Sequence, residues 1–372
     1  MRTSLSTIFE GEPIYFTLSF LIESCAARSR QLNAKPFGRT HLDATSNSLD
    51  SPALRILYLM KTCSPKYAHL IPDLIRRAIG TVPLYMTPIP TVPDSIVYEV
   101  ALPTGSLIFK AIDPDGHDPD GIGLEAWMCE AVRALGVPAP RVLTVDTSGS
   151  ELPASYFIME KASGQPLTTL SIAQQQPFLH QIGRYLQQIH TIHVEHFGWL
   201  DEQSYRQHGR ICGMARTWRE AVLADIPASL AYFQQTSALE PQDFQTIERI
   251  LELTDPLLGT ITLGHLLHGD IGGLHVWVDP DRACITSFVD FGQRSAGDRV
   301  WDIMRYEWEG VPALIEGYEL DPSLQARFWP TFHLYAVLQA LPWAQKWHAR
   351  GGVHTVEWFS TSIREARPML GL

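Results

Sequence analysis

Two aspartates and one histidine lie close together in the second half of the chain. Residues 268–279 have the sequence HGDIGGLHVWVD, and residues 289–292 have the sequence VDFG. Two carboxylates and an imidazole suit a divalent cation together with a general base, because one carboxylate can hold the metal while the other accepts a proton from an attacking hydroxyl. The candidates are Asp270 and Asp290 for these two tasks, with His275 beside them.

A β-hairpin is predicted to bring these side chains together. Segments 276–278 and 284–289 are strand-like, and residues 279–282, Asp-Pro-Asp-Arg, are typical of the turn between them. Pairing of the strands returns the chain, so Asp290 is expected beside the loop that carries the histidine. Gly292 is expected to permit the sharp exit that aims Asp290 inward, because glycine tolerates backbone angles that other residues avoid.

A cation for the phosphates of a nucleotide is the next requirement of phosphoryl transfer. Lys110 lies in the strand-like segment 106–112, and Glu125 lies in the first turn of the predicted helix 123–136. An ion pair between them would hold the ammonium in place. Each residue alone is equally typical of a solvated strand end or of a carboxylate at a helix N-terminus. The order Lys, Glu, HxD and DFG therefore carries the prediction.

The hydrophobic patterns divide the chain into three parts. Residues 1–65 show no sustained period and are expected to form an extension, with a translation start near Met60 as a hypothesis. Residues 66–163 predict a small antiparallel sheet with one main helix, and residues 164–372 are mostly helical, so the expected class is α+β with two lobes. Helices are expected at 71–79, 123–136, 178–189, 214–234, 242–258, 298–308 and 322–349, and strands at 96–102, 106–112, 141–146, 155–162, 276–278 and 284–289.

The composition excludes several classes of protein. Hydrophobic residues make up 45% of the chain, which is ample for a folded core, and the net charge of −11 argues against a nucleic-acid surface. The five cysteines are odd in number and scattered, as in reduced cytoplasmic proteins. The apolar segment 14–22 is too short to cross a bilayer and lacks the cationic start of a signal peptide. We expect a cytoplasmic protein without a nucleic-acid or membrane partner.

Residues 268–305 resemble the aminoglycoside phosphotransferase (APH) family, which shares the protein-kinase-like fold with choline kinase and other small-molecule kinases. The sequence HGDIGGLHVWVDPDRACITSFVDFGQRSAGDRVWDIMR is similar to the HGD loop, the VDFG segment and the GDxxWDI helix of that family. The resemblance extends over roughly residues 66–350 and implies a bilobal protein-kinase-like fold. Supporting matches lie at 109–110, 124–126, 136–143, 157–167 and 186–190.

The resemblance implies roles for individual residues. Asp270 would be the catalytic base or would orient the acceptor hydroxyl, and Asp290 would be the principal metal ligand. Lys110 would contact the α- and β-phosphates, with Glu125 as its ion-pair partner. The backbone of residues 157–161, which include Glu160, would bind the nucleotide base.

Further residues of the pattern are expected to support the site. His268 would be structural, Asp298 would cap the helix that follows it, and Asp302 would brace the catalytic loop. The hairpin that covers the phosphates in the family corresponds to residues 90–100, which contain two prolines and no glycine. Ser95 stands at its asparagine position and is expected to donate a hydrogen bond to the nucleotide.

His275 stands five residues after Asp270, where the family normally offers an asparagine oxygen to Mg²⁺. Mg²⁺ prefers oxygen, whereas Mn²⁺ and the later divalent metals accept a neutral nitrogen more readily. A direct ligand therefore predicts a preference for Mn²⁺. The alternatives are that His275 holds a metal-bound water, holds Asp270 itself, or only packs.

The predicted function is a kinase that transfers the γ-phosphoryl of ATP or GTP to a hydroxyl of an antibiotic or a metabolite, with Mg²⁺ or Mn²⁺. The alternative is a nucleotide-binding pseudokinase or scaffold without turnover. His275 and the prolines near residue 90 favour the alternative, whereas Lys110, Glu125 and the two aspartates favour the enzyme. The sequence does not decide the acceptor, the choice between ATP and GTP, or the oligomeric state.

Overall fold

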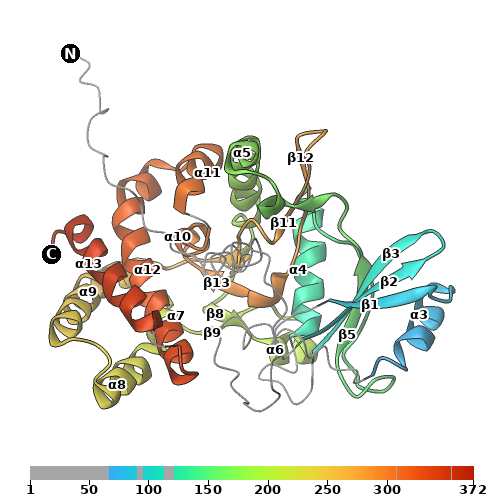
Figure 1. Cartoon of the computed structure of the whole chain (residues 1–372), viewed down its shortest axis with the longest axis horizontal. Helices are drawn as coiled ribbons and strands as arrows, with labels where there is room; N and C mark the ends of the chain where they lie inside the picture. Colours follow the sequence, from blue (N-terminus) through green and yellow to red (C-terminus); the bar gives the residue numbers. More distant parts are fainter. Residues whose placement is uncertain (1–66, 90–94, 113–120, 307, 353) are drawn as a thin grey trace, which may run out of the picture.

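Two lobes make up the part of the chain that the structure describes, a strand-rich lobe and a helical lobe (Figure 1). The expected extension, residues 1–65, and the hypothetical start near Met60 lie outside the described residues. The computed structural model describes residues 67–89, 95–112, 121–306, 308–352 and 354–372.

The strand-rich lobe is built on a five-stranded antiparallel sheet in the order β1-β2-β3-β5-β4. The four strands expected from the alternation of apolar residues are present, and β2 and β3 form a hairpin that turns at residues 103–104. The edge strand β1 was not predicted, because it contains a proline and its side chains are mostly exposed, which leaves no alternation. The strands are β1 Tyr85–Ile89, β2 Ser95–Leu102, β3 Gly105–Ile112, β4 Val142–Asp146 and β5 Tyr156–Glu160.

The two faces of this sheet have different partners. Alternation in β2 sends Ile96, Tyr98 and Val100 to the face that packs against α3, Ile71–Ile79. Each fully buried side chain of this kind stabilises the fold by about 1.5–3 kcal/mol. The intervening residues of β2 face the other side, which carries Lys110, because directly paired residues such as Val97 and Lys110 point to the same face.

Helix α4, Ile122–Ala134, joins the two lobes (Figure 1). Ile122 and Ala126 pack against Phe157 of the sheet. Leu124 and Met128 lie in the core of the helical lobe instead. One helix is therefore shared by two apolar clusters.

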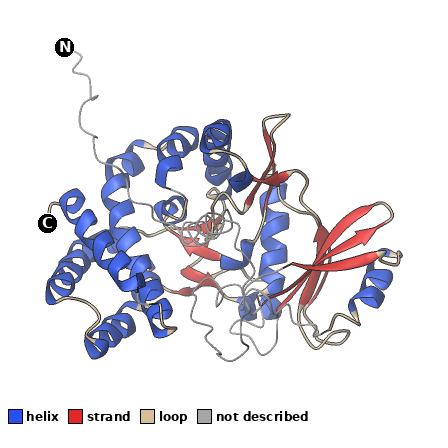
Figure 2. Cartoon of the chain, in the orientation of Figure 1, coloured by secondary structure: helices blue, strands red, loops and turns tan. Residues whose placement is uncertain are grey.

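The helical lobe contains helices in most of the expected ranges, and Figure 2 shows short strands at its centre. The predicted helix over 214–234 is wrong in detail, because residues 213–215 form a strand and a proline at the start of the second helix divides the rest. The helices Glu202–His208, Val311–Tyr318 and His354–Leu370 were not predicted. The helices are α5 Ile172–Ile189, α6 Glu202–His208, α7 Trp218–Leu223, α8 Ile226–Thr236, α9 Pro241–Gly259, α10 Arg299–Met304, α11 Val311–Tyr318, α12 Pro322–Ala349 and α13 His354–Leu370.

The short strands and 3₁₀ turns of this lobe surround the loop of interest. One small sheet has the order β7-β10-β13-β8-β9 and another the order β12-β11-β6. Their bounds are β6 Gln165–Pro166, β7 His193–Val194, β8 Phe197–Leu200, β9 Gly213–Ala215, β10 Gly264–Leu267, β11 Val276–Asp279, β12 Cys284–Phe288 and β13 Ser295–Gly297, with 3₁₀ turns at Leu167–Thr169, Phe291–Gln293 and Trp308–Gly310.

Two negative findings concern the described residues alone. No described helix combines the length and the apolar character that crossing a membrane requires. The cysteines of this part, Cys129, Cys212 and Cys284, are free thiols.

Candidate active site

The predicted hairpin is present and brings the two aspartates to one end. Val276 of β11 pairs with Phe288 of β12. The carboxylate of Asp279 closes the turn, because its Oδ1 accepts from the backbone N–H of Asp281 at 3.1 Å and of Arg282 at 3.2 Å. The loop before β11 and the segment after β12 therefore lie side by side.

The bend after this hairpin differs from the prediction. Asp290 itself takes the left-handed conformation, with φ 64° and ψ 65°, whereas Gly292 has no positive φ. Gly292 is needed for space instead, because a Cβ atom there would lie 3.1 Å from Oδ1 of Asp290 and 3.7 Å from Nζ of Lys110. Left-handed backbone in a residue other than glycine costs roughly 1–3 kcal/mol and is concentrated at functional sites.

Lys110 lies between two carboxylates. Its Nζ is 2.7 Å from Oε1 of Glu125 and 3.0 Å from Oδ1 of Asp290. The charge of Lys110 holds the pKa of Asp290 well below its usual range, against the effect of burial. Burial alone lowers the pKa of Lys110, but the two carboxylates outweigh it and hold that pKa above its usual range. Lys110 and Asp290 are therefore both charged at neutral pH.

His275 faces both aspartates. Its Nδ1 is 2.6 Å from the backbone oxygen of Asp270, and its Nε2 is 3.8 Å from Oδ2 of Asp290. A carbonyl oxygen only accepts, so Nδ1 carries the proton and the lone pair of a neutral ring lies on Nε2. Metal-binding histidines commonly donate their other N–H to a carbonyl in this way. His275 therefore makes a hydrogen bond within the loop in addition to its packing contacts.

The donor set fits a divalent metal only together with further ligands. In the described parts of the chain, no three histidine, cysteine or acidic side chains are arranged to hold a metal by themselves. Asp290 and His275 supply one carboxylate and one imidazole. A metal that is bound by one or two protein groups and completed by substrate phosphates and water is the usual case in phosphoryl transfer.

The side chain of Asp270 has a partner that the sequence did not predict. Nη2 of Arg305, the residue that ends α10, is 2.6 Å from Oδ1 of Asp270. The signal was present, because Arg305 lies three residues after Asp302, at the C-cap of α10, and positions three apart share a face of a helical turn.

Asp302 braces the catalytic loop as predicted. Its two carboxylate oxygens accept from the backbone N–H groups of His268 and Gly269, each at 2.8 Å. Nε2 of His190 lies 3.1 Å from Oδ2 of Asp302, and Nδ1 of His190 lies 2.7 Å from the hydroxyl of Tyr318. Because Asp302 is fully buried, these bonds hold the loop with little freedom.

His268 and Asp298 make contacts that stabilise the loop and the start of α10. Nδ1 of His268 accepts from the backbone N–H of Asp270 at 3.4 Å, and its ring packs on Phe291 with 4.7 Å between the centroids. Burial lowers the pKa of His268, so the ring is neutral. Asp298 caps α10 through the N–H of Val300 and pairs with Arg327 at 2.6 Å.

The residues expected at the nucleotide lie along the sheet. Ser95 begins β2 on the face that carries Lys110, but the tip of its hairpin, residues 90–94, is outside the described residues. Glu160 ends β5 with its side chain exposed, and its backbone N–H donates to the oxygen of Arg141 at 3.0 Å. The next residue, Lys161, pairs with Glu99 at 2.7 Å.

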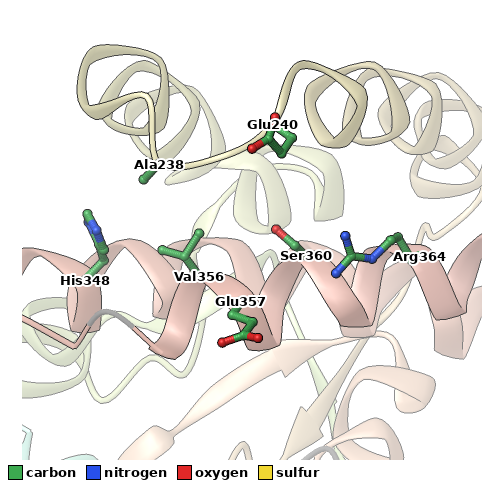
Figure 3. A pocket seen from close by; sticks show the side chains of 7 residues that line it. All are labelled: Ala238, Glu240, His348, Val356, Glu357, Ser360 and Arg364. Atoms are coloured by element: carbon green, nitrogen blue, oxygen red, sulfur yellow. The ribbon is translucent and has the colours of Figure 1, made fainter.

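A surface hollow lies elsewhere. Its volume is about 400 Å³. Figure 3 shows it between α13 and the connection of α8 to α9. His348, Ser360 and Arg364 are among the side chains that line it. It contains none of the predicted site residues, so it is separate from the aspartate cluster.

A comparison of the sequence with models of protein families identifies its family. Residues 89–329 match the model of APH, the phosphotransferase enzyme family. This is more than half of the chain, so the protein belongs to that family. It is a kinase-type phosphotransferase that acts on a small molecule. No curated protein matches the chain.

Solved structures show the same fold at low sequence identity. The aminoglycoside phosphotransferase APH(4)-Ia is 16% identical, with a TM-score of 0.62 over 81% of this chain and 99% of that chain. A protein of Thermobifida fusca YX-ER1 assigned as a fructosamine-3-kinase is 21% identical, with a TM-score of 0.56 over 80% and 98%. The GDP and kanamycin complex of APH(2")-IIia is 12% identical, with a TM-score of 0.58 over 82% and 99%. These likenesses establish the bilobal, protein-kinase-like fold.

Proposed function

We propose that this protein transfers the γ-phosphoryl group of ATP or GTP to a hydroxyl of an antibiotic or a metabolite. The observation that carries the proposal is the cluster in which Lys110 contacts Asp290 at 3.0 Å while His275 faces both aspartates. A lysine and a carboxylate held in contact are placed for phosphates and their metal, and the second aspartate is placed for the attacking hydroxyl.

Each residue then has a defined task. Asp270 accepts the hydroxyl proton or orients the hydroxyl, and Lys110 binds the α- and β-phosphates while Glu125 keeps it in place. Ser95 donates a hydrogen bond to the phosphates from the first strand position of its hairpin. The backbone around Glu160 binds the base. These positions rest on the order of the motifs and on the contacts described above.

Asp290 and His275 would hold the metal, Mg²⁺ or Mn²⁺. When bound, such a metal neutralises charge on the phosphate oxygens. The ring of His275 offers Nε2 because Nδ1 donates to the backbone of Asp270. The low pKa of Asp290 keeps its carboxylate available as a ligand at neutral pH.

Each lobe is proposed to have its own task. Residues 66–163 would bind the nucleotide, and residues 164–372 would carry the catalytic loop and the acceptor site. Four glutamates follow the GDxxWDI segment, where the resemblance implies acceptor-binding acids. Glu307 lies outside the described residues, and Glu309 is half-buried with an Oε1 that is buried and makes no hydrogen bond within the described residues. Glu316 pairs with His180 at 3.2 Å and Glu319 is exposed, so these two give a cationic acceptor no specific support.

The test is phosphoryl transfer with ATP and GTP, with Mg²⁺ and Mn²⁺, to a panel of hydroxyl acceptors. The panel should contain hygromycin B, kanamycin and a fructosamine, which the names of similar structures suggest. Asp270→Asn should reduce transfer by about 10²-fold or more while nucleotide affinity stays within about twofold, because only the base is removed. Nucleotide binding without turnover under every condition would support the pseudokinase instead.

A further inference from the structure

Arg305 holds one oxygen of the proposed catalytic base. Its Nη2 lies 2.6 Å from Oδ1 of Asp270, and its side chain is only 15% exposed. A charge-assisted hydrogen bond of this length is among the stronger contacts between side chains. The proposed function accounts for Asp270 but gives Arg305 no task.

The second carboxylate oxygen of Asp270, Oδ2, has a different environment. Oδ2 of Asp270 lies 3.7 Å from Nδ1 of His275, beyond hydrogen-bond distance, and Nδ1 already donates to the backbone oxygen of Asp270. The Asp270 side chain is 38% exposed. Arg305 therefore engages Oδ1 and leaves Oδ2 as the oxygen for a hydroxyl, on a side chain that is partly exposed.

The side chain of Gln339 in α12 also contacts Arg305. With its amide oriented as the neighbouring donors require, its oxygen accepts from Nε of Arg305 at 3.1 Å. The guanidinium then contacts Gln339 through Nε and Nη1, and Asp270 through Nη2. A side chain from the long helix α12 is thus connected to the catalytic loop through one arginine.

We propose that Arg305, oriented by Gln339, is a positioning residue that fixes the carboxylate of Asp270 for the acceptor hydroxyl. The inference rests on the proposed function of Asp270 as base or orienting group. It differs from a merely stabilising ion pair, because loss of Arg305 then changes the catalysed step and leaves nucleotide binding intact. A misplaced reacting group can cost on the order of 10²-fold in rate.

The experiment compares Arg305→Met, Arg305→Lys, Arg305→Ala and Gln339→Leu with the wild type, using the acceptor found in the panel or, without one, nucleotide hydrolysis by water. Arg305→Met should lower kcat by about 10- to 100-fold, with the KM for nucleotide within about twofold. Arg305→Lys keeps the charge but loses the fork, so its loss should be smaller. Gln339→Leu should lower kcat by several-fold. Methylguanidine should restore part of the activity of Arg305→Ala.

A double variant separates this inference from the proposed function. If Arg305 acts through Asp270, Asp270→Asn with Arg305→Met should be no slower than Asp270→Asn alone. A further full loss in the double variant, an unchanged or higher kcat in Arg305→Met, or no restoration by methylguanidine would overturn the proposal. An inactive wild type would instead overturn the proposed function. Thermal unfolding of each variant identifies any that fails to fold, and Arg305→Lys then serves in its place.

Discussion

At His275 the backbone selects which ring nitrogen is available. The carbonyl of Asp270 takes the proton-bearing Nδ1, so Nε2 is the nitrogen that lies 3.8 Å from the carboxylate of Asp290. An asparagine at this place would offer an amide oxygen. The substitution therefore changes the kind of donor and not only its size.

Replacing His275 with Asn tests this difference. We expect the wild type to favour Mn²⁺ over Mg²⁺ and the variant to shift toward Mg²⁺ by about tenfold, because an oxygen donor replaces a nitrogen. Mn²⁺ affinity in the presence of nucleotide, followed by electron paramagnetic resonance, and the ratio of turnover with the two metals are the measurements. The exposed His208, changed to Asn, is the control. An unchanged metal profile would argue against direct ligation.

At the scale of elements, α4 depends on the helical lobe for its N-terminal cap. No side chain of its own caps this helix, whose N-cap residue is Gly121. Oε2 of Glu202 in α6 accepts from the backbone N–H of Leu124 at 3.0 Å instead. A carboxylate at a helix N-terminus also favours the helix dipole. Glu125 follows Leu124 in α4, so its contact with Lys110 depends on the position of this helix.

Gly123→Ala should disturb this arrangement. A Cβ atom at residue 123 would lie 2.5 Å from Oε1 of Glu202, so the buried carboxylate must move, and this outweighs the gain of about 1 kcal/mol in helix propensity. We expect a lower melting temperature and a several-fold higher KM for nucleotide. Gly259→Ala in α9 is the matched control, because its Cβ would meet nothing within 4 Å. Equal effects of the two substitutions on melting temperature and on KM would contradict the role of Glu202 as the cap of α4.

At the scale of the whole molecule, histidines with lowered pKa values link folding to pH. Burial lowers the pKa of His265 to about 4 and that of His333 to about 4. An unfolded histidine has a pKa of about 6.5, so the unfolded chain binds more protons between these values. The free energy of unfolding therefore falls as pH is lowered through this window and levels off below it.

Urea unfolding at several pH values measures this dependence. Each histidine contributes a slope of at most about 1.4 kcal/mol per pH unit between pH 6.5 and 4. His333→Gln should reduce the slope, because one group that resists protonation in the folded state is removed. The same change at the exposed His208 should leave the slope as it is. A wild-type protein equally stable at pH 6.5 and 4.5 would contradict the expectation.

Local patterns in the sequence predicted the main elements and the order of the chemical groups. Alternation in residues 96–112 predicted the β2–β3 hairpin, because one face of the sheet is buried. The apolar spacing of residues 322–349 predicted the longest helix. The acidic brace at Asp302 was also predicted, because the motif places it on the helix after the loop. The exposed edge strand β1 had no such pattern and was missed.

The sequence by itself therefore determined which motifs are present, their order, and the residue types available for phosphoryl transfer. Only the tertiary structure decided which atoms meet. The left-handed bend at Asp290, the free Nε2 of His275 and the contact of Arg305 with Asp270 each depend on segments far apart in the chain or on backbone angles that no residue type dictates. The physical reason is that a motif specifies groups and their order, whereas distances of about 3 Å between side chains are set by packing.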